Sequence, residues 1–336
     1  MEHSLTANKR QPGRRRTLAA IACLTALAGA GAQAATPGYP AYPIHLVVPF
    51  PPGGSVDTVA RNIAPELEQQ LGQHVIIENR GGANSVIGAE YVRRAKPDGY
   101  TVLLNASLQV SNPTLLKSAR YDPIKDFVPI TEIGALPQIM VVNATSPYKT
   151  VTDLVNAARG NPGKLTWAIA AFGAAEHFAC EMVNVQAKVD MPVIPYKGGG
   201  PGLVGVMGGQ VTAMIEPMAS AYPQVKSGRL RALAVASAER LPALPNLPTV
   251  AENGFPGFDM PSWYGLWAPA DTPHEVVDRL HQAIHKVLQN PAVLKRMTAI
   301  SFMPIGSSPA EFARFQARQL EQYRAIIQQA DIKADS

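Results

Sequence analysis

The chain has 336 residues, 46% of them hydrophobic, and its 30 Lys and Arg against 25 Asp and Glu give a formal net charge of +5. Residues 1–34 hold five of the basic residues and one acidic residue, so the remainder is close to neutral and lacks the basic stripe of a nucleic-acid-binding protein. Only Cys180 lies outside this segment, which excludes an intrachain disulfide once the segment is removed.

Residues 1–34 have the organisation of a signal peptide. A basic start at 9–16 precedes a short apolar run at 17–30, and Ala32-Gln33-Ala34 supplies a small-x-small cleavage pattern. The run is short for a membrane span. We therefore expect export to the periplasm and removal of residues 1–34, by the general route or by twin-arginine export.

Strands then alternate with helices. We expect strands at 44–49, 74–78 and 100–105 and helices at 57–71 and 86–96. Such alternation predicts a mostly parallel sheet covered by helices on both faces, with ligands at the carboxyl ends of its strands. The turn at 49–57 and the segment at 105–109 fall at these ends.

The turn at 49–57 is the strongest local signal. Prolines 51 and 52 exclude a helix before Gly53, and Gly53-Gly54 lets the backbone turn tightly. Ser55 or Asp57 can cap the helix that follows, whose first amides form an anion site. A plain strand-to-helix connection is the alternative.

The second half repeats this pattern. An apolar stretch at 127–143 predicts a strand that crosses into a second unit, and Thr150 or Thr152 caps the next helix. Further strands are expected at 165–170, 193–195, 211–215, 230–236, 262–269 and 301–305. One helix is expected to begin after residue 175 and another to end near residue 207, and three more are expected at 273–289, 291–298 and 309–329. Because roughly 300 residues exceed one ordinary core, we expect two lobes.

The expected fold class is α/β, a two-lobed periplasmic binding protein in which each lobe is a mainly parallel sheet flanked by helices. Lobe 1 comprises residues 42–140 and 263–336, and lobe 2 comprises 141–262. The hinge crossings fall near 140–146 and 257–263, and a closing cleft lies between the lobes.

A family resemblance extends over the chain from Tyr42 to about Ile332. It rests on motifs in a common order: Val47-Val48-Pro49-Phe50, Glu78-Asn79-Arg80, Pro97-Asp98-Gly99-Tyr100, Tyr196-Lys197-Gly198, Gly208-Gly209-Gln210-Val211 and Ser262-Trp263-Tyr264-Gly265. With these motifs the chain resembles the Bug or TctC solute receptors of the tripartite tricarboxylate transporter system.

The resemblance implies a type II Venus-flytrap fold and a non-catalytic role. Such a receptor captures a small organic carboxylate in the periplasm, as a monomer without cofactor or metal, and delivers it to the transporter's membrane permease subunits. It touches membrane components only peripherally and binds no nucleic acid. In the family, backbone amides of the first glycine loop hold the carboxylate, often through water and without an arginine clamp.

Three departures from the family pattern concern the ligand. Residues 170–175 read Ala-Ala-Phe-Gly-Ala-Ala where relatives have a glycine- and hydroxyl-rich loop. Glu176 stands where relatives often have proline, and Gly205 where they commonly have an acidic residue. We hypothesise a ligand with one carboxylate and an apolar or aromatic body.

The candidate ligand-binding residues lie at strand ends and helix starts in both lobes. They are Phe50, Pro52, Gly53, Gly54, Ser55, Asp57, Asn84, Ser107, Gln109, Phe172, Gly173, Glu176, His177, Tyr196, Lys197, Gly198 and Ser220. Asp57 fits helix stabilisation as well, and Asn84 fits helix capping. Glu176 fits either a favourable helix dipole or contact with a ligand amine.

Other functions leave weaker signals. A secreted hydrolase would need a nucleophile, but no Gly-x-Ser-x-Gly elbow occurs. A sensor that couples to a membrane signalling partner would have the same fold and stays open. His281 and His285 have the spacing of a zinc motif but no intervening glutamate, so a solvated helix face is the simpler interpretation.

Overall fold

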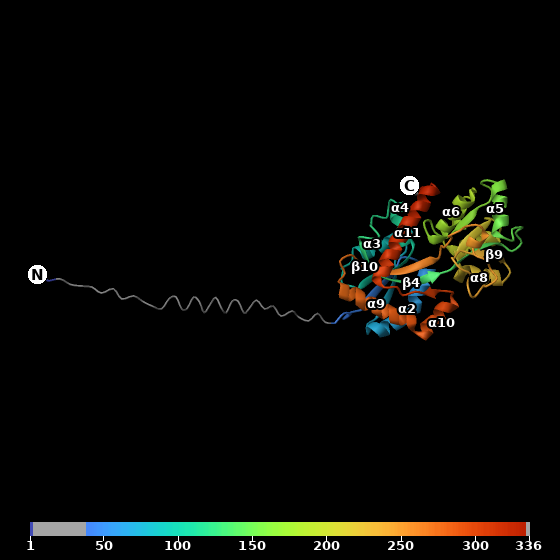
Figure 1. Cartoon of the computed structure of the whole chain (residues 1–336). Helices are drawn as coiled ribbons and strands as arrows, with labels where there is room; N and C mark the ends of the chain where they lie inside the picture. Colours follow the sequence, from blue (N-terminus) through green and yellow to red (C-terminus); the bar gives the residue numbers. More distant parts are fainter. Residues whose placement is uncertain (3–37, 334–336) are drawn as a thin grey trace. The chain divides into compact units, whose positions relative to one another are not determined.

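The computed structural model describes residues 1–2 and 38–333 (Figure 1). The chain divides into Met1–Tyr39 and a compact unit, Pro40–Ser336, and the fold below is that of the second unit. The predicted signal peptide lies almost wholly outside the described residues. Among the described helices, none is long and apolar enough to cross a membrane.

A six-stranded sheet organises one part of the unit, which we call the first half although its last strands and helices come from the C-terminal end of the sequence. Its strands are β1 (Ile44–Val48), β2 (Val75–Asn79), β3 (Thr101–Ala106), β4 (Phe127–Leu136), β10 (Ser262–Pro269) and β11 (Met303–Pro304), in the order β11-β4-β10-β3-β1-β2. Its helices are α2 (Ser55–Leu71), α3 (Val86–Arg93), α4 (Leu108–Leu115), α9 (His274–Gln289), α10 (Pro291–Ala299) and α11 (Pro309–Gln329). Strand β1 is an almost continuous apolar run, as expected for a strand covered on both faces.

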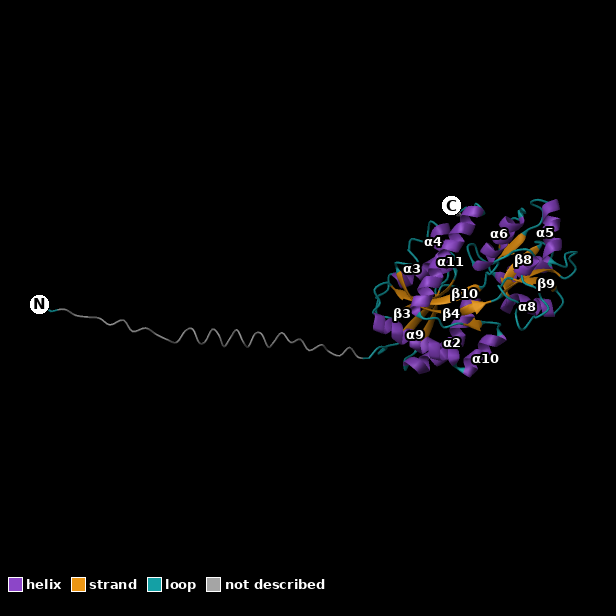
Figure 2. Ribbon diagram, viewed as in Figure 1, coloured by secondary structure: helices purple, strands orange, loops and turns teal. Residues whose placement is uncertain are grey.

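A five-stranded sheet organises the second half. Its strands are β5 (Gln138–Asn143), β6 (Trp167–Ile169), β7 (Val193–Pro195), β8 (Ala213–Pro217) and β9 (Leu230–Val235), in the order β7-β6-β8-β5-β9. Helices α5 (Val151–Gly160), α6 (Ala175–Ala187), α7 (Gly199–Met207) and α8 (Met218–Lys226) accompany it, with a short 3-10 turn, η1 (Ala251–Asn253). Figures 1 and 2 show α5, α6 and α8 grouped around this sheet, apart from α2, α9 and α10.

The α/β class is confirmed, but the sheets are mixed rather than mainly parallel. Strand β1 runs parallel to β2 and β3, whereas β10 is antiparallel to β3 and β4. Likewise β6 is parallel to β7 and β8, whereas β5 is antiparallel to β8 and β9. The antiparallel strands are those at which the chain passes between the sheets. Strand β4 of the first sheet leads into β5 of the second sheet with only Pro137 between them, and β10 returns the chain to the first sheet.

Pro137 also divides the apolar stretch that we expected as one strand at 127–143. Proline lacks the amide that a sheet ladder needs, so the ladder ends there and the next strand begins in the other sheet. Two helices were not predicted, α4 and α8. Each contains an internal proline, Pro113 or Pro223, which weakens the helical signal in the sequence.

The core is centred on aromatic side chains of β10 and α11. Trp263, Trp267 and Phe312 are fully buried, and the indole Nε1 of Trp263 donates to the Tyr323 hydroxyl at 2.9 Å. Trp263 therefore packs in the core. Tyr323 also stacks on Phe178 of α6 with ring centroids 4.4 Å apart, so α11 joins the two halves.

Candidate functional site

Six helices follow the carboxyl ends of the parallel strands: α2, α3, α4, α6, α7 and α8. None of the six has a side-chain cap, and neither does α9. Elsewhere, α5, α10 and α11 begin with Thr150, Asn290 and Ser308, whose side chains each accept a hydrogen bond from a first-turn amide. The strand ends therefore present helix amides without a side-chain acceptor, which is the basis of an anion site.

The first glycine loop is held from inside by Asp57. Its carboxylate accepts from the Gly53 amide at 2.8 Å, from Arg61 Nε at 2.8 Å and from Asn79 Nδ2 at 2.9 Å. Burial opposes ionisation, but these hydrogen bonds outweigh it and hold the pKa of Asp57 below its usual value. Two expectations need correction: the Gly53 amide is already occupied, and Asp57 organises the loop rather than facing a ligand.

Ser55 is the first residue of α2 and is exposed, whereas we expected Ser55 or Asp57 to cap this helix. Gly54 holds the capping position instead and has no side chain to accept a hydrogen bond. The Ser55 side chain lowers the pKa of the Tyr264 hydroxyl of β10. The amides of the first turn therefore lie beside this serine.

Tyr264 of β10 is buried, and its hydroxyl accepts a hydrogen bond from Ser262 Oγ at 3.3 Å. Burial raises the pKa of its hydroxyl to about 12, and the charges of Glu176 and Glu216 act in the same direction. Hydrogen bonds with Ser262 and Ser55 oppose the change.

Glu176 and Glu216 are buried carboxyl groups, 6% and 4% exposed. Glu176 is the second residue of α6, and Glu216 lies near the end of β8. Burial raises the pKa of Glu176 to about 7. Burial, and then the charge of Glu176, raise the pKa of Glu216 to about 8.

The Glu216 carboxyl group has one satisfied and one unsatisfied oxygen. Its Oε1 accepts from the Ser220 hydroxyl at 2.7 Å, and its Oε2 is buried without a hydrogen-bond partner. Gly199, the first residue of α7, lies against this carboxyl group: a Cβ there would fall 2.9 Å from Oε2 and still closer to Oε1. A side chain at this position would displace the Glu216 carboxyl group.

The second glycine loop, residues 198–200 at the start of α7, differs from the expectation that Gly198 binds the ligand. The Gly198 amide donates to the Ala170 carbonyl at 3.2 Å, so it is not free for a ligand. Tyr196 lies over Gly205, where a Cβ would come within 2.8 Å of the tyrosine Cζ. Lys197 is exposed, and among the described contacts it forms no ion pair.

Four of the predicted residues contribute to contacts between or within the halves. Asn84 Nδ2 donates to the Phe172 carbonyl at 2.8 Å, and Ser111 Oγ donates to the Gly173 carbonyl at 2.7 Å. The Gly173 amide donates to His177 Nδ1 at 3.0 Å, and the His177 ring lies 4.6 Å from that of Phe172. These groups fasten the loop after β6 to the first half. The alternative that Asn84 caps α3 is wrong, because Ser85 holds the capping position and no side chain caps the helix.

Ser107 and Gln109 are buried at the start of α4. Gln109 Oε1 accepts from Asn105 Nδ2 at 3.0 Å. The Gln109 Nε2 group is buried without a partner. Phe50 is half-buried and its carbonyl accepts from Asn79, whereas Pro52 is exposed.

Of the predicted residues, Ser220 is hydrogen-bonded to Glu216, and Glu176 is buried at the start of α6. Sequence reasoning missed Glu216 as a site residue. The available signal was an acid at the end of an apolar strand, after Ala213-Met214-Ile215, where a carboxyl group has no obvious structural use. Among the described residues, no group of three or more His, Cys, Asp or Glu could hold a metal ion.

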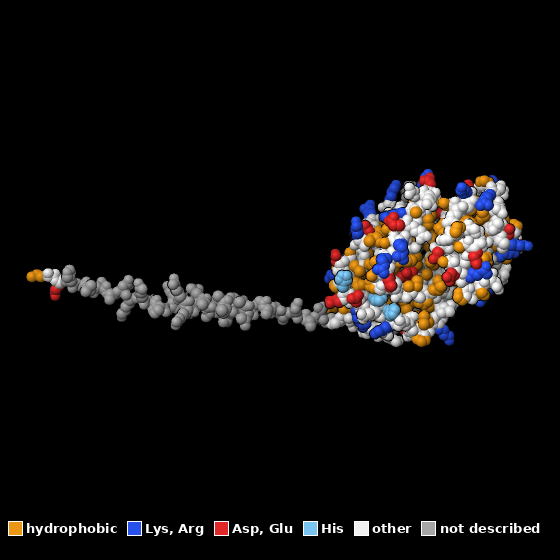
Figure 3. Space-filling view, in the orientation of Figure 1, with side chains coloured by type: hydrophobic (Ala, Val, Ile, Leu, Met, Phe, Trp, Pro, Cys, Tyr) orange, Lys and Arg blue, Asp and Glu red, His pale blue; other side chains and the backbone are white. Residues whose placement is uncertain are grey.

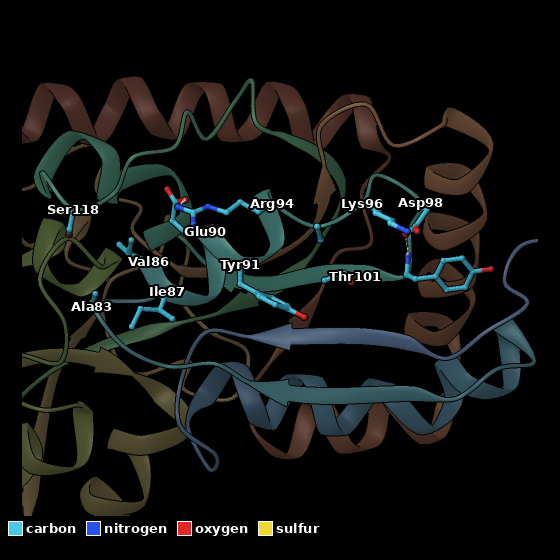
Figure 4. Close-up of a pocket in the computed structure, with 12 residues that line it drawn as sticks. Ala83, Val86, Ile87, Glu90, Tyr91, Arg94, Lys96, Asp98, Thr101 and Ser118 are labelled. Carbon is cyan, nitrogen blue, oxygen red and sulfur yellow. Dashed lines mark hydrogen bonds and ion pairs between the residues drawn. The ribbon is translucent and has the colours of Figure 1, made fainter.

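A hollow of about 860 Å³ lies elsewhere, over α3 (Figure 4). Its wall includes Glu90 and Arg94, which turn toward each other and form an ion pair at 3.1 Å. In this wall Glu90 Oε1 is buried without a hydrogen-bond partner, and Val86 is the first residue of α3, which has no side-chain cap. Glu216 and the starts of α2, α4, α6, α7 and α8 do not line the hollow, and we place the candidate site at these strand ends. On the face in Figure 3, acidic and basic side chains are interspersed.

Known proteins resemble this chain over most of its length. A family model described as "Tripartite tricarboxylate transporter family receptor" (TctC) matches residues 59–332. Protein BugT of Bordetella pertussis is 35% identical over 323 residues, which cover 95% of this chain and 98% of BugT.

Solved structures show the same fold. The periplasmic binding protein BugD aligns with a TM-score of 0.78 at 34% identity, covering 88% of this chain and 99% of BugD. A protein from R. palustris, determined with adipate, aligns with a TM-score of 0.81 at 32% identity, covering 88% of this chain and 99% of that protein. With identities of 34% and 32%, these proteins resemble the chain in sequence as well as in fold.

Proposed function

Because the chain belongs to the tripartite tricarboxylate transporter receptor (TctC) family, we propose that it is a periplasmic receptor that captures a small organic carboxylate for uptake. The observation that carries the proposal is the set of uncapped helix starts at the strand ends of both sheets. The first turn of α2 receives the carboxylate, with the Ser55 hydroxyl beside it. The adipate held by the R. palustris relative supports this class of ligand.

The ligand has one carboxylate and an apolar or aromatic body. This part of the proposal rests on residues 170–175, which offer no side-chain hydroxyl, and on Phe172, which is half-buried beside the site. Two lobes, 42–140 with 263–336 and 141–262, close on the ligand about crossings near 140–146 and 257–263. The closed monomer then delivers it to permease subunits in the membrane. The family and fold are those of receptors rather than enzymes.

A thermal-shift screen of the mature protein, purified from the periplasm, tests the proposal. A ligand that binds only the folded state at 100 times its Kd adds about 2.7 kcal/mol of stability, which raises the Tm by several degrees. The screen covers aliphatic mono- and dicarboxylates and aromatic acids at millimolar concentration. A rise of Tm with at least one carboxylate is expected, and no response across all three classes contradicts the proposal.

Substitution of Gly54 identifies the anion site. Gly54 has an ordinary backbone conformation, and a Cβ there meets only the Pro51 carbonyl at 3.6 Å, so Gly54→Val leaves the fold intact while it covers the α2 amides. We expect at least tenfold weaker binding of the acid found in the screen. Gly160→Val, at the end of α5 with nothing within 4 Å, is the matched control and leaves binding unchanged.

A further inference from the structure

We propose that the groove over α3 is a docking surface for an acidic, amphipathic segment of a partner protein. The groove is the hollow of about 860 Å³ described above, and its wall extends along α3 from Ala83 at one end to Asp98 at the other (Figure 4). This inference rests on the delivery step of the proposed function, because it assigns the surface and the charge through which the receptor meets its membrane partner.

The wall of the groove carries large apolar side chains that are exposed. Ile87 and Tyr91 lie one turn apart on α3, both line the groove, and they are 53% and 40% exposed. The Arg80 guanidinium lies 3.7 Å from the centroid of the Tyr91 ring and covers one face of it. Neighbouring exposed apolar side chains on one helix face are a feature of interaction sites, and tyrosine and arginine often dominate the binding energy of interfaces.

Positive charge is concentrated around this groove. Residues 81–120 hold five Lys or Arg and two Asp or Glu, whereas the rest of the chain after residue 34 holds 20 and 22. Ser118 also lines the groove, and it lies between two exposed basic residues. The basic side chains that line or flank the groove are Arg94, Lys96, Lys117 and Arg120. An acidic partner is therefore attracted to this face and held in one orientation.

One acid of the wall, Glu90, is already paired. Its Oε2 accepts from both Arg93 and Arg94, so these three side chains together carry a net positive charge. Among the described residues, neither Lys96 nor Lys117 takes part in an ion pair, and both are exposed. These lysines can therefore receive carboxylates of a partner.

One end of the groove is fixed by an unusual backbone. Ala83, Asn84 and Ser85 have φ angles of 44°, 55° and 74°, and such left-handed conformations are unfavourable for most residues other than glycine. Asn112 Nδ2 holds this turn, since it donates to the Asn84 carbonyl at 2.6 Å and to Ser85 Oγ at 3.1 Å. The surface around Ala83 is therefore preorganised, which lowers the entropic cost of docking.

The shape of the groove favours a protein segment over other anions. A lipid surface is flat on this scale and would leave the hollow unfilled. A small acid would span only part of a wall that extends past both ends of α3. An amphipathic helix fills such a groove with apolar side chains spaced three or four residues apart, and its acidic flanks then face the basic rim.

Uptake by cells of the organism that encodes this receptor tests the docking surface. The cells lack their own receptor gene and carry either the natural gene or the double variant Lys96→Glu/Lys117→Glu, and the substrate is the acid found in the thermal-shift screen. We expect the variant to bind this acid with unchanged affinity in calorimetry, while uptake slows roughly tenfold or more because the reversed charges repel an acidic partner. Ile87→Ser should slow uptake about threefold or more through the loss of an apolar contact.

Matched variants on other helices of the first half separate docking from general effects. Lys286→Glu/Lys295→Glu reverses two exposed lysines of α9 and α10, and Leu294→Ser removes an exposed apolar side chain of α10. Both should bind the acid and support uptake as the natural protein does. Circular dichroism checks that each variant is folded.

Synthetic peptides test the chemistry of the partner directly. The probe is a helical peptide of about 14 residues, roughly four turns, with leucine on one face and glutamate on the flanks. A second peptide has lysine in place of glutamate. We expect the glutamate peptide to bind the purified receptor more tightly than the lysine peptide, and to bind Lys96→Glu/Lys117→Glu roughly tenfold more weakly or less.

The outcomes are distinguishable. The docking surface is wrong, while the receptor function stands, if both groove variants support normal uptake or if the glutamate peptide binds no better than the lysine peptide. Binding to phosphatidylglycerol vesicles that Lys96→Glu/Lys117→Glu loses, without a preference for the glutamate peptide, would identify a lipid surface and also overturn the proposal. If no acid binds the natural protein, the proposed function fails, and the peptide result still decides the docking surface.

Discussion

At the residue scale, Glu216 makes the stability of the ligand-free protein depend on pH. Its pKa rises from 4.5 to about 8 on folding, and that of Glu176 rises to about 7. The folded chain therefore holds protons that the unfolded chain has lost, and stability falls as the pH rises from 4.5 to about 8. Glu216→Gln should flatten this decline and, at pH 8, add on the order of 1–3 kcal/mol.

Urea unfolding at pH 5 and pH 8 measures this effect. The exposed acid Glu321, in an ion pair within α11, gives a matched control, and Glu321→Gln should leave the pH dependence as it is. An equally steep decline in Glu216→Gln would show that Glu216 is ionised in the folded protein throughout this range.

Two adjacent glycines give a second test at the same scale. A Cβ at Gly199 would overlap the Glu216 carboxyl group, whereas a Cβ at Gly200 meets nothing within 4 Å. We expect Gly199→Ala to cost about 1–3 kcal/mol of stability and to displace the carboxyl group. Gly200→Ala should be neutral or slightly stabilising. Equal stabilities in denaturant unfolding would contradict the observed packing.

At the element scale, α2 is positioned through Asp57. Its carboxylate joins the glycine loop, the helix and β2 through Gly53, Arg61 and Asn79. Asp57→Asn keeps the size but replaces an acceptor oxygen by a donor, so we expect a loss of about 1–3 kcal/mol and weaker ligand binding. Asp153→Asn, in the exposed capping box of α5, should cost no more than about 1 kcal/mol and leave binding unchanged. Unfolding and titration of both variants give the comparison.

Most elements could be predicted from the sequence because apolar periodicity and glycine or proline boundaries agree along the chain. The predictions failed where a proline lay inside an element, as in α4 and α8, or where strand direction depended on the crossing at Pro137. The starts of α2, α6 and α7 were predicted from the strand-turn-helix pattern. Glu216 was missed because its surroundings depend on Gly199, which comes from another element of the chain.

At the scale of the whole molecule, two hydrogen bonds fasten the loop after β6 to the first half. Asn84 donates to the Phe172 carbonyl and Ser111 to the Gly173 carbonyl. If the halves move against each other, the double variant Asn84→Ala/Ser111→Ala should favour the open state. We expect a larger radius of gyration in ligand-free protein by small-angle scattering, and several-fold weaker binding.

Asn161→Ala is the matched control, because Asn161 Nδ2 donates within its own helix end, to the Ala157 carbonyl. It should change neither the radius nor the affinity. If the double variant and the control scatter and bind alike, these bonds do not hold the halves together.

The tyrosine over Gly205 has a consequence for related receptors. The ring of Tyr196 occupies the volume that any side chain at 205 would need. A homologue with an acid at that position must therefore rotate its tyrosine elsewhere, and the wall formed by the loop after β7 changes its shape and charge together. Substrate preference across such homologues should then sort by the residue at this one helical position, even among proteins whose glycine loops are identical.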